Sequence, residues 1–278
     1  MAPSKTPDMT AQVTDNACAQ TPLIQLERVT KCFDERASTL NNLNLAVYPG
    51  QFLSIVGPSG CGKSTILRLM AGLEKADAGR VRIDAPAAHP QRDIAFVFQE
   101  ATLMPWANVF DNVWLPLRLK GISRTEAQSK VEDALGAVGL SDFANAYPAQ
   151  LSGGMKMRVS IARASVTKPR ILLMDEPFAA LDEISRARLT DDLLAHWQRT
   201  GISIVMVTHT VSEAVYLSQR ILVMSPRPAR IVQDLSITFD HPREASLRLS
   251  EPFVAKVAQV SRMLLDATLD QDKSKVCA

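Results

Sequence analysis

GPSGCGKST, residues 57–65, matches the pattern G-x-x-x-x-G-K-[S/T] of a phosphate-binding loop. The apolar run Phe52–Val56 before it predicts a buried strand, and residues 66–71 after it predict a helix. Glycines bring backbone amides close to an anion, and a helix N-terminus adds about half a positive charge. Strand, loop and helix together therefore predict a site for the phosphates of a nucleotide.

Every residue of this loop is expected to contact the nucleotide. Lys63 can reach the β- and γ-phosphates, and the hydroxyl of Ser64 can bind Mg²⁺. The alternative is a glycine-rich turn that happens to precede a lysine, and it leaves the flanking strand and helix unexplained. The expected contact residues are Gly57, Pro58, Ser59, Gly60, Cys61, Gly62, Lys63, Ser64 and Thr65.

The composition is that of a globular protein. The 278 residues allow one large domain or two small ones, with 46% hydrophobic and 22% charged residues. A net charge of +2 is too balanced to suggest a nucleic-acid partner. No apolar stretch approaches the roughly 18 residues of a membrane span. Residues 1–21 are polar and lack the apolar segment of a signal peptide, so we expect a disordered tail.

The four cysteines, Cys18, Cys32, Cys61 and Cys277, are scattered and form no C-x-x-C pair. This spacing favours free thiols in a reducing cytosol over disulfides or a zinc site. Because Cys61 lies inside the phosphate loop, we expect its thiol to be open to alkylation and to be shielded by ATP.

Alternating apolar and polar residues at 23–30 and 43–48 predict two half-buried strands. Two adjacent strands ahead of the phosphate loop suggest a small antiparallel sheet, and residues 79–84 and 94–98 predict two more strands. Helical patterns follow, and Ser123 with Glu126 can form a capping box. From residue 171 onward, apolar strands alternate with helices, which implies a parallel sheet.

The predicted fold class is α/β, with a nucleotide-binding core, an N-terminal antiparallel subdomain and a helical insertion. The tail covers residues 1–21, the nucleotide-binding domain residues 22–240 and a helical extension residues 241–278. Within the domain, residues 22–99 and 166–240 form the core, and residues 100–165 form the helical insertion. Residues 245–269 have the apolar spacing of one or two helices, and the polar residues from 270 on are expected to fray.

An apolar run at residues 171–174 ends in Asp175 and Glu176. A buried parallel strand that ends in two carboxylates suits a magnesium-nucleotide site. We expect Asp175 to hold the metal and Glu176 to orient or deprotonate the attacking water. Without the phosphate loop, a strand that simply ends in acidic loop residues would be the better interpretation.

The stretch LSGGM, residues 151–155, places Ser152 at an N-cap, with Gly153 and Gly154 opening a helix. This arrangement predicts a second phosphate-binding helix N-terminus in one chain. The stretch is a weak signal by itself, but it becomes discriminating because ILLMDEP follows shortly after it.

Residues 23–235 resemble the ATP-binding subunit of ABC transporters. GPSGCGKS resembles the Walker A motif, ILLMDE the Walker B motif and LSGGM the signature motif. The resemblance implies a P-loop NTPase core with a RecA-like sheet, ATP and Mg²⁺ as ligands, and ATP contacts from Ser152, Gly153 and Gly154. The continuation MKMR departs from the common QQQR or QRQR, outside the phosphate-contacting part.

Single residues extend this resemblance. Gln99 resembles the Q-loop glutamine, with an implied role in catalysis and at the metal, and residues 180–182 resemble the D-loop. His209 resembles the switch histidine, which implies a catalytic role. Phe33 stands where the family has an aromatic residue that stacks on adenine, usually Tyr. Taken alone, such residues are more often solvated or in the core, and their order relative to the three motifs favours the functional interpretation.

The family architecture implies a homodimer, with two ATP molecules between the Walker A motif of one subunit and the signature motif of the other. It also implies integral-membrane permease subunits, an indirect solute-binding partner and a peripheral position at the cytoplasmic face of the inner membrane. Apolar residues that open the helical insertion could form a docking groove for a permease helix. These residues are Leu103, Met104, Pro105, Trp106, Val109 and Trp114.

Three stretches resemble the nitrate, sulfonate and taurine importer group within the family: FQEATLMPW, DEPFAALDEISR and THTVSEAVYLSQRILVMSPRPARI. The solute stays open, because an ATP-binding subunit has no solute pocket. Other functions considered are a non-transport ABC ATPase, a P-loop kinase or GTPase, and a nucleotide sensor without catalysis. A single cassette disfavours the first, LSGGM and His209 disfavour the second, and Glu176 with His209 disfavours the third.

Overall fold

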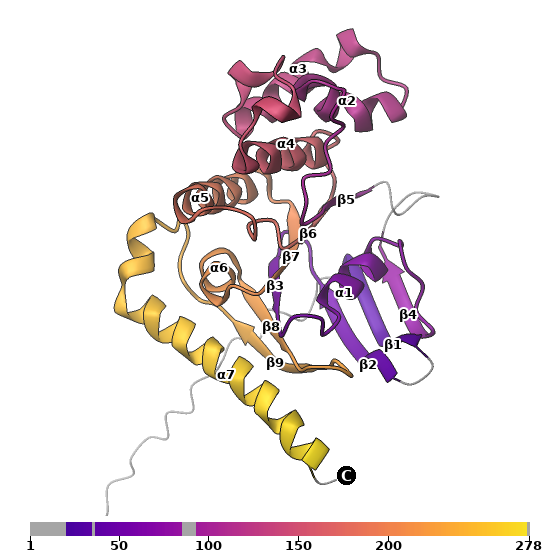
Figure 1. The fold of residues 1–278 in the computed structure, drawn as a ribbon, viewed down its shortest axis with the longest axis vertical. Coiled ribbons are helices and arrows are strands. Elements are labelled where there is room, and N and C mark those ends of the chain that lie inside the picture. The colour runs from indigo at the N-terminus through magenta and orange to yellow at the C-terminus, as the bar shows by residue number, and fades with distance from the viewer. Residues whose placement is uncertain (1–20, 35–36, 85–92, 277–278) are drawn as a thin grey trace, which may run out of the picture.

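The computed structural model describes residues 21–34, 37–84 and 93–276. The expected tail at 1–21 therefore lies, apart from Thr21, outside the described residues, as do Cys18 and Cys277. The strands form a three-stranded and a six-stranded sheet, with helices around them (Figure 1).

The six-stranded sheet carries the residues of greatest interest. Five strands are parallel, and the edge strand β9 is antiparallel to β8. The apolar runs of the four inner strands are buried on both faces, as parallel sheets require, whereas the edge strand β5 is mostly half-buried. The strand β9 was not expected, since its sequence IVQDLS is half polar and lies partly exposed at the edge. The order is β5 (Ile94–Val97), β6 (Ile171–Asp175), β7 (Ser203–Thr208), β3 (Phe52–Val56), β8 (Arg220–Met224) and β9 (Ile231–Ser236).

Alternate residues of these strands feed two hydrophobic cores. Leu53 and Ile55 of β3 face the core that includes the apolar side of α1 (Lys63–Met70). Phe52 and Val56 face the other core, which includes α5 (Glu183–Thr200) and α6 (Val211–Leu217). Helices therefore cover both faces of the sheet, and the strand ends remain as the places where polar groups can gather.

The predicted small antiparallel sheet is present, in the order β2 (Ala37–Val47), β1 (Ile24–Asp34) and β4 (Ala78–Ile83). Its buried face packs in the same core as α1. Thr39 and Leu40 of β2 reach the phosphate loop at Gly62.

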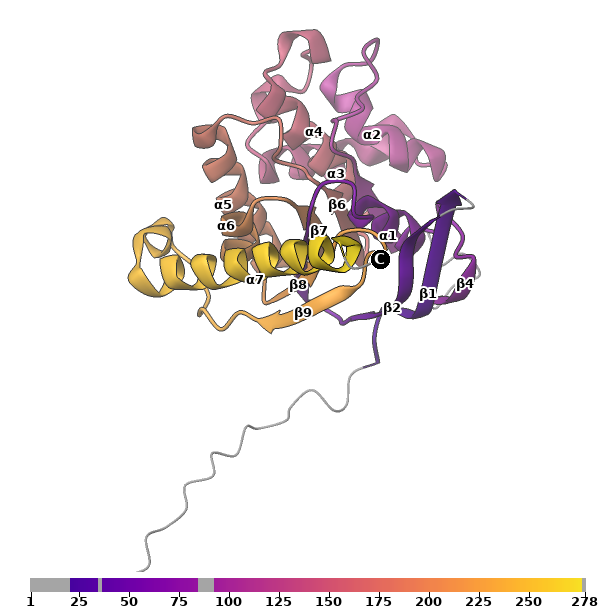
Figure 2. The ribbon, with the colours of Figure 1, turned by 60° about the horizontal axis from the view of Figure 1, so that its bottom comes forward.

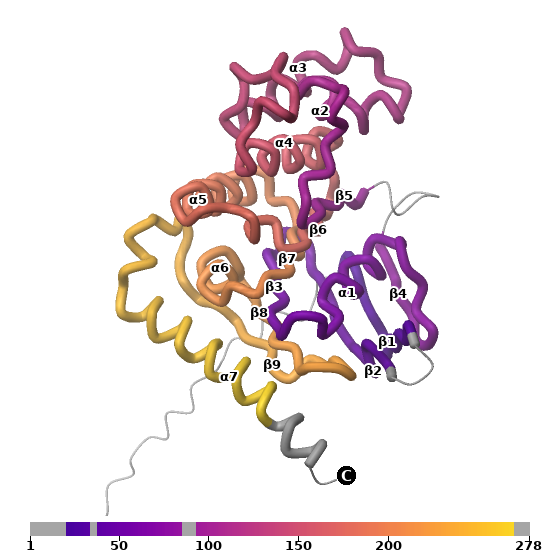
Figure 3. The backbone as a smooth tube through the Cα atoms, viewed as in Figure 1, coloured from indigo at the N-terminus to yellow at the C-terminus, as the bar shows by residue number. Residues whose placement is uncertain are grey.

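Three helices lie between β5 and β6: α2 (Val109–Leu119), α3 (Arg124–Ala137) and α4 (Gly153–Ser165). They form a layer at the top of the molecule, beyond the sheet (Figures 1 and 3). The predicted capping box is confirmed, because Glu126 N donates to Ser123 Oγ and Ser123 N donates to the Glu126 carboxylate. Short 3-10 turns at Ser141–Phe143 and Pro148–Gln150 link α3 to α4.

The C-terminal segment continues from the 3-10 turn Ala245–Leu249 into α7 (Glu251–Val276), which runs alongside β8 and α6 (Figure 2). The helix α7 is continuous to Val276, and fraying from residue 270 stays a prediction. Buried Phe253 and Val260 anchor its first half, and the helix propagates beyond them. Across the described part of the chain, no helix is long and apolar enough to cross a membrane.

Candidate functional site

Three neighbouring parallel strands end at one edge of the sheet. Val56 of β3 pairs with Thr208 of β7, and Asp175 of β6 pairs with Val207. The phosphate loop, the Asp175–Glu176 pair and His209 therefore emerge side by side. Open α/β sheets bind ligands at this carboxyl edge of their strands.

The phosphate loop depends on glycine at position 62, the N-cap of α1. Gly62 has a φ of 118°, and a Cβ there would lie 2.9 Å from Leu40 and 3.0 Å from Thr39. Both the backbone conformation and the close approach of β2 exclude a side chain. The first-turn amides of α1 have no intrahelical acceptor, so they are available to an anion.

Lys63 is almost fully buried in the loop. Its Nζ donates to the carbonyl oxygens of Gly57 at 2.9 Å and of Pro58 at 3.0 Å. These bonds hold the ammonium group beside the loop backbone and the start of α1. A cation at this point complements the partial charge of the helix N-terminus in attracting phosphate oxygens.

Ser64 and Asp175 form a pair of oxygen ligands. The hydroxyl of Ser64 donates to Asp175 Oδ1 at 2.9 Å, and the carboxyl is almost buried. Burial raises the pKa of Asp175, the hydrogen bond from Ser64 lowers it, and the charge of Glu176 raises it. Hard oxygen donors fit Mg²⁺, which takes one or two carboxylates and completes its shell with phosphates and water. The described residues contain no cluster of three or more His, Cys, Asp or Glu that could hold a metal ion.

Glu176 has a backbone φ of 46°, uncommon for a residue other than glycine. Its amide donates to the carbonyl oxygen of Val207 at 2.9 Å, which fixes the turn beyond β6 to β7. Strained residues of this kind cost about 1–3 kcal/mol and cluster at functional sites. The carboxylate beyond this strained turn faces His209.

His209 Nδ1 lies 3.1 Å from Glu176 Oε2. Because an ionised carboxylate only accepts hydrogen bonds, the imidazole donates this one. Glu176 is mostly buried, whereas the His209 ring is half exposed. A general base oriented by a second side chain is the arrangement needed to activate a water molecule.

Gln99 follows a strand of the six-stranded sheet, whereas Phe33 lies on the separate three-stranded sheet. Gln99 is exposed two residues beyond β5, whose Val97 pairs with Met174 just before Asp175. The ring of Phe33 is 54% exposed on β1, with Lys31 Nζ 5.2 Å from its centroid. Both side chains are exposed, and among the described residues neither forms a hydrogen bond with the Ser64–Asp175 or the Glu176–His209 pair.

The signature segment packs against the D-loop of the same chain. Ser152 caps α4 by accepting from Met155 N. A Cβ on Gly154 would lie 3.7 Å from Leu181, and one on Gly153 would lie 3.9 Å from the carbonyl oxygen of Ala180. Ser152 and Gly153 are exposed, so the capped helix N-terminus is open to a ligand.

The expectation that Cys61 is open to alkylation is wrong, because its side chain is only 1% exposed. Its sulfur packs under Gly57, where a Cβ would lie 3.1 Å away, and belongs to the hydrophobic core. Burial raises the pKa of the Cys61 thiol, which further lowers its reactivity. The place of Cys61 in the loop sequence gives no sign that its side chain points into the core.

Two features of the site escaped the sequence analysis. Arg227, beyond β8, donates from Nε to the carbonyl oxygen of Gly60 at 2.6 Å and so touches the phosphate loop. Buried Glu213 accepts a hydrogen bond from Thr208, directly before His209. No spacing in the sequence links these residues to the motifs. The burial of the Glu213 carboxylate marks it as unusual, but this burial is visible only once the fold is known.

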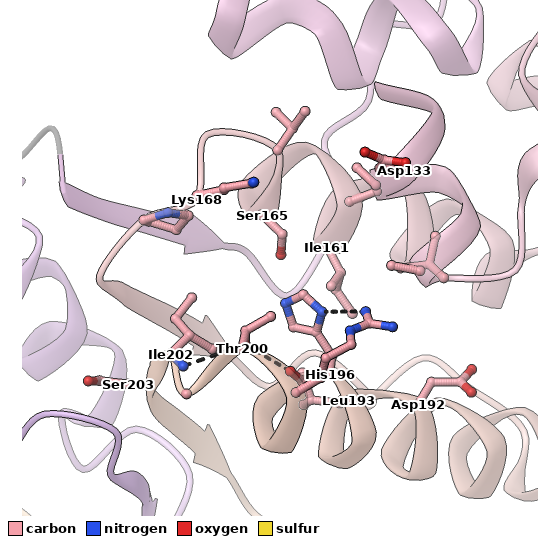
Figure 4. A pocket seen from close by; sticks show the side chains of 18 of the residues that line it. Asp133, Ile161, Ser165, Lys168, Asp192, Leu193, His196, Thr200, Ile202 and Ser203 are labelled. Carbon is pink, nitrogen blue, oxygen red and sulfur yellow. Dashed lines mark hydrogen bonds between the residues drawn. The ribbon is translucent and has the colours of Figure 1, made fainter. Parts of the chain in front are cut away.

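A cavity of about 840 Å³ lies at the opposite edge of the sheet (Figure 4). The amino ends of β6 and β7, with α3, α4 and α5, form its walls, which include Ser165, His196 and Ser203. Since the phosphate loop, Asp175, Glu176 and His209 lie at the other end of these strands, this cavity is separate from the candidate site.

Comparison with known proteins places the chain in one family. Residues 40–179 match the family model described as ABC transporter. An uncharacterized ABC transporter ATP-binding protein of Methanocaldococcus jannaschii is 44% identical over 250 residues, covering 88% of this chain and 92% of that protein.

Two further relatives have names that describe import. The taurine import ATP-binding protein of Pseudomonas aeruginosa is 42% identical over 217 residues, covering 77% of this chain and 82% of that protein. The aliphatic sulfonates import ATP-binding protein of Cupriavidus necator is 44% identical over 225 residues, covering 80% and 71% respectively.

Solved structures agree with the predicted fold class, which is confirmed. A dimeric ATP-binding cassette in a post-hydrolysis state, bound to ADP and Pi, has a TM-score of 0.68 and 34% identity, covering 78% of this chain and 100% of that one. CbiO1 from Clostridium perfringens shares the fold, with a TM-score of 0.72 and 23% identity, covering 86% and 99%. The chain belongs to the ABC transporter family.

Proposed function

We propose that this chain is the ATP-hydrolysing subunit of an importer for a small solute such as taurine, a sulfonate or nitrate. As a member of its family, the chain is an ATPase coupled to transport. The observation that carries the proposal is the meeting of the Ser64–Asp175 and Glu176–His209 pairs beside the phosphate loop. The taurine and sulfonate import relatives support the solute class.

In this proposal the chain's residues divide the work of hydrolysis. Lys63 and the amides of the phosphate loop bind the β- and γ-phosphates, and Phe33 offers its ring to the adenine. Ser64, Asp175 and Gln99 hold Mg²⁺, which offsets phosphate charge. Glu176 takes a proton from the water that attacks the γ-phosphorus, while the bond to the ADP oxygen breaks. His209 keeps the Glu176 carboxylate aimed at that water.

A second copy of the chain completes the site in this proposal. The contacts of Gly153 and Gly154 are with the D-loop and α5 of their own chain, and Ser152 is exposed at the helix end. We therefore assign Ser152, Gly153 and Gly154 to the phosphates held by a partner subunit. ATP binds the closed pair better than the open one, and that difference in affinity drives the conformational cycle.

The helical insertion, residues 100–165, is the proposed docking site for a permease at the inner face of the membrane. Trp106 is 77% exposed next to exposed Pro105, whereas Val109 is buried. Replacing Trp106 with Glu should weaken assembly with the permease and leave ATP binding intact. Leu249→Glu is the matched control, because Leu249 is 88% exposed on a distant turn. Equal assembly of both variants would remove this surface from the proposal.

Uptake by cells tests the importer assignment. The gene is deleted in its host, and uptake of labelled taurine, ethanesulfonate and nitrate is compared after complementation with the wild type or with Glu176→Gln. We expect that only the wild type restores uptake of one solute. In a host that has the solute-binding protein, it should also restore growth on that solute. Restoration by Glu176→Gln, or no change for any solute, would contradict the proposal.

A further inference from the structure

Glu213 is a buried carboxylate with a role that ATP binding itself does not explain. It lies in the first turn of α6, and 8% of its side chain is exposed. An ionised carboxylate is rarely buried unless other groups pair with it. One of its partners belongs to the turn that carries His209, and the other lies on α5 and binds a second loop of the site.

The first loop is the switch turn, residues 208–210, which carries His209. Thr208 Oγ1 donates to Glu213 Oε2 at 2.7 Å and accepts from the amide of Thr210 at 3.0 Å. The residue before His209 is therefore bound directly to the Glu213 carboxylate, and the residue after it is bound to the same hydroxyl of Thr208.

The second loop is the D-loop, residues 180–182. Arg186 on α5 donates from Nη2 to the carbonyl oxygen of Leu181 at 3.0 Å. Arg186 Nε lies 3.6 Å from Glu213 Oε1, and it is buried without a hydrogen-bond partner among the described residues. The two charges thus attract each other at a distance slightly too long for a hydrogen bond.

These contacts form a continuous path. Glu176 contacts His209, the switch turn contacts Glu213, Glu213 contacts Arg186, and Arg186 holds Leu181, on which Gly154 packs. Burial raises the pKa of Glu213, whereas the bond from Thr208 and the charge of Arg186 lower it. The bond from Thr208 and the charge of Arg186 compensate for taking the carboxylate out of water.

We infer that Glu213 is a positioning residue for hydrolysis, which holds the His209 turn and, through Arg186, the D-loop in one arrangement. The inference rests on the proposed function of this edge as an ATPase site. Glu213 does not contact the reacting atoms. It acts on Glu176 through His209, and on the signature segment through Leu181. When the loss of such a positioning residue displaces a catalytic group by about 1 Å, the rate can fall on the order of 10²-fold.

Steady-state hydrolysis of Mg-ATP by the full chain tests this inference. Glu213→Gln keeps the volume and the acceptor for Thr208 but removes the charge that faces Arg186, and Arg186→Met removes the cation. Each should lower kcat by about 10–10²-fold, while the KM for ATP stays within about twofold, because the phosphate loop is untouched. The double variant should be no slower than the slower single variant, since both break one path.

Arg158→Met is the matched control. Arg158 lies on α4 and pairs at 2.9 Å with Asp192 of α5, the helix that also carries Arg186. This pair is away from the strand ends of the site. Its loss should leave kcat unchanged. Thr208→Val, which keeps the shape and removes the hydroxyl, supplies a second variant should Glu213→Gln fold poorly, and it should lower kcat in the same way.

A Glu176→Gln background separates positioning from general loss of structure. In the Glu176→Gln variant, the additional change Glu213→Gln should have little further effect on kcat, because Glu213 influences hydrolysis by way of Glu176. Wild-type kcat in Glu213→Gln, Arg186→Met and Thr208→Val, or equal loss in the Arg158→Met control, would overturn the inference while leaving the ATPase assignment in place. Absence of hydrolysis by the wild type would instead contradict the proposed function.

Discussion

The two edges of the parallel sheet both collect polar side chains, but they differ in how those groups are partnered. At the carboxyl edge, Ser64 donates to Asp175, and His209 donates to Glu176. At the amino edge, the hydroxyl of Ser165 is buried without a hydrogen-bond partner in the described part of the chain, beside a cavity of about 840 Å³ (Figure 4).

This comparison shows that cavity volume is a poor guide to chemistry in this molecule. The proposed metal ligands Ser64 and Asp175 form one hydrogen-bonded pair at the carboxyl edge, and the proposed base Glu176 forms another with His209. The amino edge offers room and cationic groups such as Lys168, without any such constellation. Variants at the two edges should therefore differ in their effects on turnover, and the following predictions test that difference.

Glu176→Gln should have the largest effect. The amide keeps the size of the side chain but cannot accept the proton of the attacking water. Turnover of Mg-ATP should fall on the order of 10²–10⁴-fold, the usual contribution of a general base. Single-turnover hydrolysis of labelled ATP measures this loss, and a wild-type rate would remove Glu176 from the role of base.

The same variant should retain ATP and persist as the closed dimer. Gel filtration with Mg-ATP should give a dimer for Glu176→Gln and mainly monomer for the wild type. Asp175→Asn provides the contrast, because it weakens Mg²⁺ binding and should remain monomeric. A monomeric Glu176→Gln variant that still binds ATP would contradict the proposed assembly.

Lys63→Ala should lower ATP affinity by about 10–10²-fold, since a charged hydrogen bond is worth roughly 1.5–3 kcal/mol. The ammonium group that donates to the carbonyl oxygens of Gly57 and Pro58 is the one proposed to bind phosphate. Equilibrium binding of a fluorescent ATP analogue gives the Kd. Lys168→Ala at the amino edge is the control, and equal losses in the two variants would erase the distinction between the edges.

The sequence predicted the carboxyl edge well because its signals are local. A buried strand that ends in Asp175 and Glu176 must present them at the edge where the phosphate loop also emerges, once the strands are parallel. Tertiary packing decided the rest. The inward turn of Cys61, the approach of Arg227 to Gly60 and the link between Glu213 and Arg186 each depend on elements far apart in the chain. The edge strand β9 was missed since half of its residues are polar.

A pair of serine variants sharpens the comparison at smaller scale. Ser64→Ala removes a proposed Mg²⁺ ligand and a bond to Asp175, and it should lower Mg-dependent turnover by roughly tenfold. Ser165→Ala removes a buried hydroxyl without a partner among the described residues, so turnover should stay unchanged and the free energy of unfolding should stay level or rise by up to about 1 kcal/mol. Urea unfolding and a magnesium titration of activity measure both effects.

The smallest expected effect concerns His196 at the amino edge. Burial, followed by the nearby charge of Arg199, lowers the pKa of this imidazole below its usual 6.5. Below pH 6.5 the unfolded chain therefore binds a proton that the folded chain does not, and the free energy of unfolding falls as the pH drops further. Above pH 6.5 the imidazole is neutral in both states, and titration of His196 then costs no stability.

The His196→Gln variant cannot titrate at this position. Its free energy of unfolding should therefore fall less than that of the wild type between pH 7.5 and 5.5. Urea unfolding at the two pH values gives this difference, while the kcat for ATP at pH 7.5 should be the same in both proteins. A kcat that falls in His196→Gln would show that the amino edge takes part in the chemistry of the other edge.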